Sequence, residues 1–291
     1  MQLELAKYNV RFTAQGRGRQ PDFPGSAWRG AFGRALRLAT CTTRLPACQP
    51  CPRYRDCSYP AIFETPADPA GESLLGHNDG VPNPYVLAPG WAGARMLIPG
   101  DEVNLDVTLV GAAMAQADLV FAALAAAAAG GIGPDRVPLS LVCRMTMPVD
   151  VTAAMPERLR LTFTTPLRLT TQGALVTAAI FQPRHLLGAL VRRASLLVQH
   201  HRAGVIDLDF QDLKTRAAKA SFLTTDIVWR DWARRSARQG KVIRMGGLMG
   251  TAVLPMAHLE PFWPLLRLVP ALHAGKGTTM GLGAITLASA D

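Results

Sequence analysis

The stretch LHAGKGTTMGLGAITLA, residues 272–288, runs from the end of a predicted helix through a glycine-rich loop into a predicted strand. A second stretch, AAAGGIGPDRVPLSLV at residues 127–142, follows the same order. Two copies of helix, glycine loop and strand indicate a diverged internal duplication. We therefore predict two domains, at residues 1–148 and 149–291.

The hydrophobic pattern of the first half predicts alternating strands and helices. Residues 102–110 alternate between apolar and polar side chains, which is typical of a half-buried strand. The Ala-rich stretch 113–129 favours a helix, as does the stretch 26–38, which starts at the plausible N-cap Ser26. Strands at residues 3–12 and 137–144 complete a ferredoxin-like order of strand, helix, strands, helix and strand.

The second half repeats this order. Its predicted strands are residues 159–163, 227–229, 247–254 and 284–288, and its predicted helices are 183–201 and a proline-interrupted 259–272. The predicted fold class is α+β, with two tandem ferredoxin-like (RRM-like) domains and a Cys-rich metal-binding insertion in the first.

The charge balance of the chain is strongly basic. Lys and Arg number 31 against 21 Asp and Glu, for a net charge of +10 and a pI near 10.0. Such a surface attracts polyanions through phosphate contacts and counterion release. A basic soluble protein without such a ligand is the alternative, and an anionic membrane is a weaker one because no basic amphipathic helix stands out.

No segment predicts export or a membrane span. The start, MQLELAKYNVRF, alternates like a strand and carries Glu4 and Lys7, unlike a signal peptide. The most apolar stretch, residues 114–129, contains Asp118 and is short for a membrane span, so we expect a packed helix. We expect a cytoplasmic protein with no membrane partner.

The glycine-rich loop is the strongest functional signal. Its glycines allow close backbone approach and can expose N–H groups to phosphate, and Lys276 adds a cation. A nucleotide P-loop is rejected, because Lys276 precedes Gly277 rather than Ser or Thr and the loop follows a helix. A tight turn that needs left-handed residues is the structural alternative. The predicted RNA-contacting residues here are Gly275, Lys276, Gly277, Gly281 and Gly283.

A second basic segment lies at residues 229–244, where six Arg and Lys side chains fall near two Trp residues. Arginine binds phosphates bidentately, and Trp can stack on a base. A solvated basic hairpin with its Trp residues in the core is the alternative. The further predicted RNA-binding residues are Arg234, Arg235 and Arg238 here, and Arg192 and Arg193 on the helix 183–201.

Four of the five cysteines lie close together, with the spacing Cys41-x6-Cys48-x2-Cys51-x5-Cys57. In a chain without an export signal, such a cluster indicates a metal rather than disulfides. Four thiolates form a closed, structural zinc site, and an iron–sulfur cluster is the less favoured reading. Four ordinary thiols remain the alternative.

Taken together, these segments make the sequence resemble a known family, the CRISPR precursor-RNA-processing endoribonucleases of the RAMP superfamily. Besides the glycine loop, the resemblance rests on segments that follow one another in the family's order. These segments are residues 24–37, 57–64, 82–87, 164–169, 190–197 and 232–239.

The resemblance implies two ferredoxin-like domains that hold RNA on a shared face. It also implies cleavage without a catalytic metal, in which a ribose 2′-OH attacks the adjacent phosphate and leaves a 2′,3′-cyclic phosphate. The implied partners are CRISPR repeat RNA, expected to fold as a hairpin, and other CRISPR effector subunits. The product is expected to stay bound.

The catalytic residues are the point where this sequence departs from the family, which often places a histidine at or just after the first helix. Arginines stand there instead, and the first histidine is His77. Arginine can stabilise a phosphorane but is a poor proton carrier at neutral pH. We expect a composite site of Arg29 or Arg37 with His273 or Lys276. The alternatives are a non-catalytic RAMP subunit that binds guide RNA and, last, a zinc-containing DNA-binding regulator.

Overall fold

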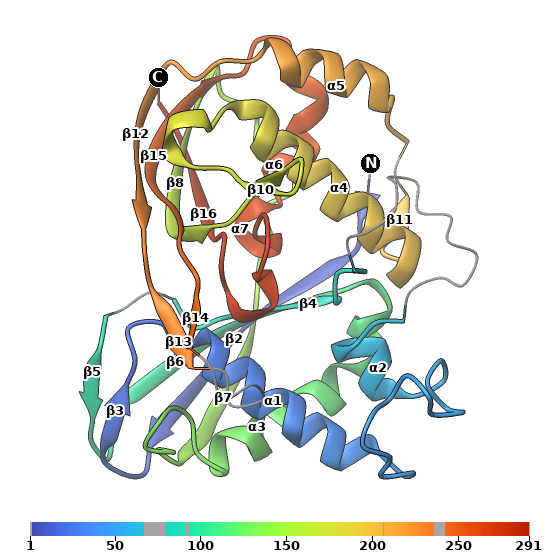
Figure 1. Ribbon diagram of the computed structural model, residues 1–291, viewed down its shortest axis with the longest axis vertical. Helices are drawn as coiled ribbons and strands as arrows, with labels where there is room; N and C mark the ends of the chain where they lie inside the picture. Colours follow the sequence, from blue (N-terminus) through green and yellow to red (C-terminus); the bar gives the residue numbers. More distant parts are fainter. Residues whose placement is uncertain (1, 67–79, 91–92, 206, 236–241, 291) are drawn as a thin grey trace. The chain divides into compact units, whose positions relative to one another are not determined.

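The computed structural model describes residues 2–66, 80–90, 93–205, 207–235 and 242–290 (Figure 1). The chain forms two compact units that divide between Pro148 and Val149. The N-terminal unit comprises Gln2–Pro148 together with Ser195–Ile206, and the C-terminal unit comprises Val149–Ala194 and Asp207–Asp291. The predicted α+β class, with a four-stranded antiparallel sheet in each half, is confirmed.

The N-terminal unit is a sheet covered by two long helices. In chain order its main elements are β2 (Leu5–Ala14), α1 (Gly25–Thr40), β4 (Tyr85–Ala88), β6 (Glu102–Val110), α3 (Ala117–Ala129) and β7 (Leu139–Met147). The strands lie in the antiparallel order β4-β6-β2-β7. The strands β2, β6 and β7 and both helices follow the order that the sequence predicts, and β4 was not predicted.

The core of this unit follows from the alternation along its strands. Phe12 of β2 and Leu105 of β6 are buried, as are Trp28 of α1 and Leu124 of α3, and the four belong to one hydrophobic cluster. The two helices contact each other, and Figure 1 shows them together on one side of the sheet. Burial of each such side chain stabilises the unit by about 1.5–3 kcal/mol.

Within the described residues, one helical stretch, Gly111–Ala129, is long and apolar enough by composition to cross a membrane. It consists of a 3₁₀ turn, η1 (Gly111–Gln116), followed by α3. Val120, Phe121 and Leu124 of α3 are buried in the unit's core. Its apolar composition is therefore explained by packing on the sheet.

Several smaller elements complete the N-terminal unit, and the sequence did not predict them. β1 (Gln2–Leu3) pairs with β11 (Gly204–Val205), and β3 (Gly18–Gln20) pairs with β5 (Arg95–Leu97). A short helix, α2 (Ser58–Phe63), follows the cysteine loop. These elements are too short to show a helical or strand period in the sequence.

The C-terminal unit has the same plan. Its sheet has the antiparallel order β12-β15-β8-β16, formed by Thr224–Arg230, Gly247–Pro255, Arg158–Leu167 and Ile285–Ser289. Its helices are α4 (Pro183–His201), α5 (Phe210–Lys219), α6 (Trp263–Leu266) and α7 (Val269–Leu272). Short pieces complete it: η2 (Ala178–Ile180), η3 (Glu260–Phe262), η4 (Thr278–Met280), and the pairs β9 (Thr170–Thr171) with β10 (Ala174–Leu175) and β13 (Ala233–Arg235) with β14 (Val242–Arg244).

One local prediction was wrong. Ser26 does not cap α1, because the helix begins one residue earlier, at Gly25, and its N-cap is Pro24, which makes no side-chain hydrogen bond. The proline-interrupted helix predicted at residues 259–272 forms three short pieces, since its prolines lack the N–H that an unbroken helix needs. The helix predicted at residues 183–201 has the bounds that the structure shows.

Candidate nucleic-acid interface

The glycine-rich loop connects α7 to β16 and is shaped by left-handed backbone. Four glycines have positive φ: Gly275 (+73°), Gly277 (+82°), Gly281 (+86°) and Gly283 (+69°). A Cβ at Gly275 would lie 2.3 Å from the Arg168 carbonyl oxygen, and one at Gly283 would lie 1.9 Å from that of Ala274. Glycine is therefore required at both positions by a close backbone approach as well as by φ.

The end of β8 and the residues after it hold this loop in place. The Lys276 N–H donates to the Arg168 carbonyl at 2.8 Å, and the Gly283 N–H donates to the Pro166 carbonyl at 3.1 Å. The Thr165 hydroxyl donates to the Gly281 carbonyl at 2.8 Å and accepts from the Ala284 N–H at 2.9 Å. The amides of residues 276 and 283 thus serve the fold, so the tight-turn reading accounts for part of the glycine pattern.

Thr165 was not singled out by the sequence, although it lies in the segment 164–169 that carries the family resemblance. It is buried and makes both loop contacts through one hydroxyl. The sequence could not show that Thr165 holds the glycine-rich loop, because Thr165 and Gly281 are far apart along the chain.

Lys276 is the cation that this loop presents. Its side chain is exposed, while its neighbours Ala274 and Thr278 are buried. The backbone on either side of it is fixed by the contacts described above. An ammonium group held outward on a rigid loop is suited to bind a phosphate.

His273 is buried at the entrance to the same loop. Its side chain is 3% exposed, and Nδ1 donates to the Leu282 carbonyl at 3.1 Å. Its backbone, at φ 56° and ψ 171°, occupies a region that is almost exclusive to glycine and costs about 1–3 kcal/mol. A buried ring bonded to a carbonyl is better placed to hold the loop than to exchange protons with RNA. The predicted catalytic role remains a prediction.

The two candidate arginines of α1 are both half-buried. The guanidinium carbon of Arg29 lies 4.4 Å from the centre of the Phe63 ring, a cation–π contact. Arg37 lies over Tyr59 at 5.9 Å and donates to the Leu45 carbonyl, so it is turned toward the cysteine loop. Arg34, between them, is exposed. Arg29 and Arg37 belong to one unit and His273 and Lys276 to the other, so the composite site remains a prediction.

The paired arginines of α4 differ in burial. Arg192 is half-buried, whereas Arg193 is 8% exposed and donates through Nε to the Leu272 carbonyl at 3.1 Å. Burial lowers the pKa of the Arg193 guanidinium to about 10. Arg193 thus holds the end of α7, next to the glycine loop, and it does not present its charge to a ligand in this conformation. This placement argues against its predicted direct contact with RNA.

The basic segment at residues 229–244 forms a hairpin that extends from β12. Arg234 pairs in register with Ile243, and Arg235 with Val242, while Arg230 and Arg244 are exposed. Trp229 donates to the Asp231 carboxylate at 2.9 Å. Arg238 lies outside the described residues. The hairpin thus offers exposed arginines, and both Trp residues are half-buried.

The remaining histidines offer few alternatives for acid–base chemistry. His77 lies outside the described residues. His201 is 4% exposed, and its Nε2 lies 2.7 Å from the Pro82 carbonyl oxygen. His201 is therefore not solvated, because the last turn of α4 is packed within the N-terminal unit.

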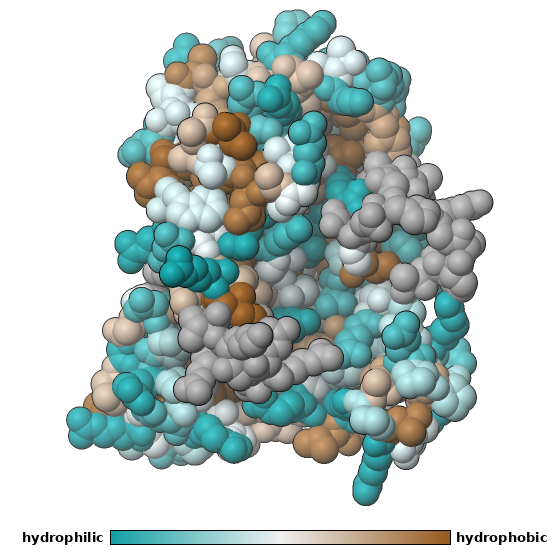
Figure 2. Space-filling model, in the orientation of Figure 1, coloured by the Kyte–Doolittle hydropathy of each residue, from teal (hydrophilic) through white to brown (hydrophobic). Residues whose placement is uncertain are grey.

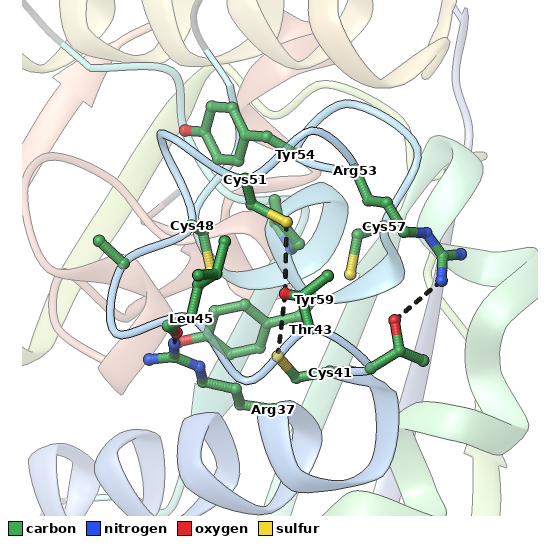
Figure 3. A pocket seen from close by; sticks show the side chains of 13 residues that line it. Arg37, Cys41, Thr43, Leu45, Cys48, Cys51, Arg53, Tyr54, Cys57 and Tyr59 are labelled. Carbon is green, nitrogen blue, oxygen red and sulfur yellow. Dashed lines mark hydrogen bonds between the residues drawn. The ribbon is translucent and has the colours of Figure 1, made fainter.

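The four clustered cysteines lie around one cavity in the N-terminal unit (Figure 3). All four thiols are free and half-buried. Cys143, by contrast, lies on β7. The structure therefore places around one cavity the four residues that the sequence singled out as metal ligands, although no three of them are close enough to hold an ion as they stand.

Two family models match the chain. A model described as the AF_1859 N-terminal domain matches residues 3–152. The model of the CRISPR-associated endoribonuclease Cas6 matches residues 161–285, which include the glycine loop. The two matches follow one another along the chain, and the second defines the class as a CRISPR-associated endoribonuclease. The C-terminal half of the chain belongs to the Cas6 family of CRISPR-associated endoribonucleases.

Solved structures match the fold of this chain along its whole length. One Cas6 product complex is 14% identical with a TM-score of 0.63, and the match covers 98% of this chain and 99% of that one. A second Cas6 product complex is 15% identical with a TM-score of 0.61 and the same coverages. Thermus thermophilus Cas6 is 13% identical with a TM-score of 0.58, covering 99% of this chain and 100% of its own. At these identities the likeness shows the fold, and no curated protein matches the sequence.

Proposed function

We propose that this protein cleaves CRISPR repeat precursor RNA by internal attack of a ribose 2′-OH and retains the mature guide RNA. The observation that carries this proposal is the Cas6 family match over residues 161–285, with Lys276 exposed on a loop that is held rigidly by its neighbours. In this proposal the two units are ferredoxin-like RNA-binding domains in a cytoplasmic protein.

The proposed reaction needs little from the protein besides positioning and charge. The 2′-oxygen forms a bond to phosphorus while the bond from phosphorus to the 5′-oxygen breaks, which leaves a 2′,3′-cyclic phosphate and a 5′-OH. A base takes the 2′ proton, an acid protonates the leaving oxygen, and cations stabilise the phosphorane. Lys276 and Arg29 are suited to the last of these roles. The loss of proton transfer by a side chain would slow the reaction by about 10²–10⁴.

Exposed arginines supply the binding surface for the RNA in this proposal. They are Arg230 at the end of β12, Arg244 at the end of β14, and Arg158 and Arg160 on the outer face of β8. Hydrophilic side chains predominate on the face drawn in Figure 2. Arg19 contributes less, because its guanidinium pairs with Asp135 at 2.9 Å and lowers the pKa of that carboxyl to about 2.

The partners are proposed from the relatives. One similar structure is described as a RAMP protein that binds different RNA substrates, with a TM-score of 0.52 and 11% identity. Another is a Cas6-RT-Cas1–Cas2 complex, in which the match covers 29% of that chain. We propose repeat RNA, folded as a hairpin, as the ligand of this chain, and other CRISPR subunits as its protein partners.

Cleavage should survive removal of divalent metal ions, because 2′-OH attack needs no metal-bound nucleophile. The test is a brief incubation of end-labelled repeat RNA with the protein in EDTA at neutral pH. We expect one specific cut, an upstream fragment that ends in a 2′,3′-cyclic phosphate and a downstream fragment that begins with a 5′-OH. Cleavage that stops in EDTA and returns with Mg²⁺ would contradict the proposal.

The composite site predicts that some substitutions slow the cleavage step, whereas others weaken only the binding of RNA. Loss of a cation that stabilises the phosphorane should slow single-turnover cleavage about 10²-fold, or roughly 3 kcal/mol. Loss of a residue that only grips phosphate should weaken binding and reduce the salt dependence by about one charge. The variants are Arg29→Ala, Arg37→Ala, His273→Ala and Lys276→Ala, measured at saturating protein. Wild-type rates in all four would refute the composite site.

His273 allows a finer separation of roles. His273→Asn retains a side-chain amide that can donate to the Leu282 carbonyl, but it cannot transfer a proton. Cleavage by His273→Asn at the wild-type rate, with loss in His273→Ala, would identify His273 as a positioning residue. Equal loss in both variants would support acid–base chemistry.

A non-catalytic RNA-binding RAMP subunit is the second candidate function. The observation that favours it is the absence of histidine from α1, together with the burial of His273. Tight binding of repeat RNA without any cleavage, in EDTA or in Mg²⁺, would support this candidate over the nuclease.

A further inference from the structure

The loop from Cys41 to Cys57, between α1 and α2, has an unusual interior. Nearly all of its side chains are exposed. Those that are half-buried are Cys41, Cys48, Cys51, Tyr54 and Cys57. The interior of this loop is therefore made of four thiols and one Tyr ring. A loop of this length with so little apolar contact needs another source of order.

The four thiols point toward one another from different parts of the loop (Figure 3). The Thr43 hydroxyl lies among them, 3.5 Å from the Cys51 sulfur and 4.0 Å from that of Cys41. The Cys51 N–H donates to the Cys48 carbonyl at 2.9 Å, so Cys48-x2-Cys51 forms a turn that sets two thiols on one side. All four thiols are free.

We propose that this loop binds one Zn²⁺ ion through the thiolates of Cys41, Cys48, Cys51 and Cys57. Four thiols release four protons as four Zn–S bonds form, which gives a closed tetrahedral structural site. In the part of the chain that the structure describes, no three His, Cys, Asp or Glu side chains are gathered closely enough to hold an ion as they stand. Binding therefore requires the thiols to move closer together around the ion.

The charge of the surroundings suits this site. Zn²⁺ with four thiolates carries a net charge of −2, and two basic residues, Arg37 and Arg53, are among those that line the same cavity. Arg37 also donates to the Leu45 carbonyl, and Arg53 donates to the Thr42 hydroxyl at 3.0 Å. Arg37 thus contacts the loop backbone and Arg53 contacts a loop side chain. Both arginines carry a positive charge that would attract the negative charge of the proposed zinc–thiolate site.

The zinc ion would fix the loop and take no part in RNA cleavage, so this inference does not rest on the proposed function. The test is elemental analysis of untagged, full-length protein. We expect about one zinc per chain, and a loss of most of this zinc in Cys48→Ser and Cys51→Ser. Cys143→Ser is the matched control, because it removes a thiol outside the loop, and it should retain the zinc.

A second measurement guards against variants that fail to fold. Wild-type protein exchanged into Co²⁺ should show the intense near-ultraviolet absorption of thiolate-to-cobalt charge transfer, and trypsin should cut after Arg44, Arg53 or Arg55 only after the metal is removed. Wild-type protein without zinc and without the cobalt–thiolate band would overturn the proposal. Iron with acid-labile sulfide in place of zinc would also overturn it.

Discussion

Repeat RNA with 2′-deoxyribose at the scissile nucleotide is expected to resist cleavage entirely while it still binds the protein. The 2′-oxygen is the proposed nucleophile, so its removal leaves no atom to attack phosphorus. Binding should fall little, since one hydroxyl hydrogen bond contributes only about 1 kcal/mol. The measurement is single-turnover cleavage at saturating protein, with the dissociation constant determined on the same RNA.

The matched control is the same substitution one nucleotide away, on either side of the cut. That RNA should be cleaved at nearly the normal rate, because its scissile 2′-OH is intact. Normal cutting of the substrate that is deoxy at the scissile position would show that water or another external nucleophile attacks phosphorus. The proposed mechanism would then be wrong, although the family assignment would stand.

The fold could be predicted from the sequence where hydrophobic periods are long. The strand at residues 102–110 and the helix at 183–201 have the bounds that their patterns indicate. The short helix α2 and the paired strands β3 and β5 could not be predicted, since a few residues carry no measurable period. Residues 259–272 form three short helical pieces rather than one helix, because their prolines lack the N–H that a continuous helix needs.

The candidate site could be predicted by residue type but not by exposure. The glycine loop and the cysteine cluster were found from spacing alone, because both patterns are local in the chain. Burial depends on distant segments, so the sequence could not show that Arg193 binds the Leu272 carbonyl or that His273 binds that of Leu282. Lys276, which is exposed, keeps the role that the sequence suggested for it.

Gly283→Ala is expected to lower the free energy of unfolding by about 4 kcal/mol. The new Cβ would lie 1.9 Å from the Ala274 carbonyl oxygen and 3.1 Å from the Ala274 nitrogen, and both are backbone atoms that cannot rotate away. The same two residues are joined by a hydrogen bond from the Ala274 N–H to the Gly283 carbonyl at 2.9 Å. Left-handed φ costs an alanine about 1–2 kcal/mol, and the overlap adds about 1–3 kcal/mol.

Gly173→Ala separates these two contributions. Gly173 has φ +80°, close to that of Gly283, but a Cβ there meets no atom within 4 Å. It belongs to the same C-terminal unit, in the turn between β9 and β10, so both variants report on one unfolding transition. We expect Gly173→Ala to cost about 1 kcal/mol, the contribution of φ alone, in urea-unfolding midpoints of the full-length protein. Equal midpoints for the two variants would mean that the loop yields to the added methyl group. The hydrogen bonds from the amides of residues 276 and 283 would then not be needed to hold the loop. These amides would be free to donate to RNA phosphate, as the sequence predicts.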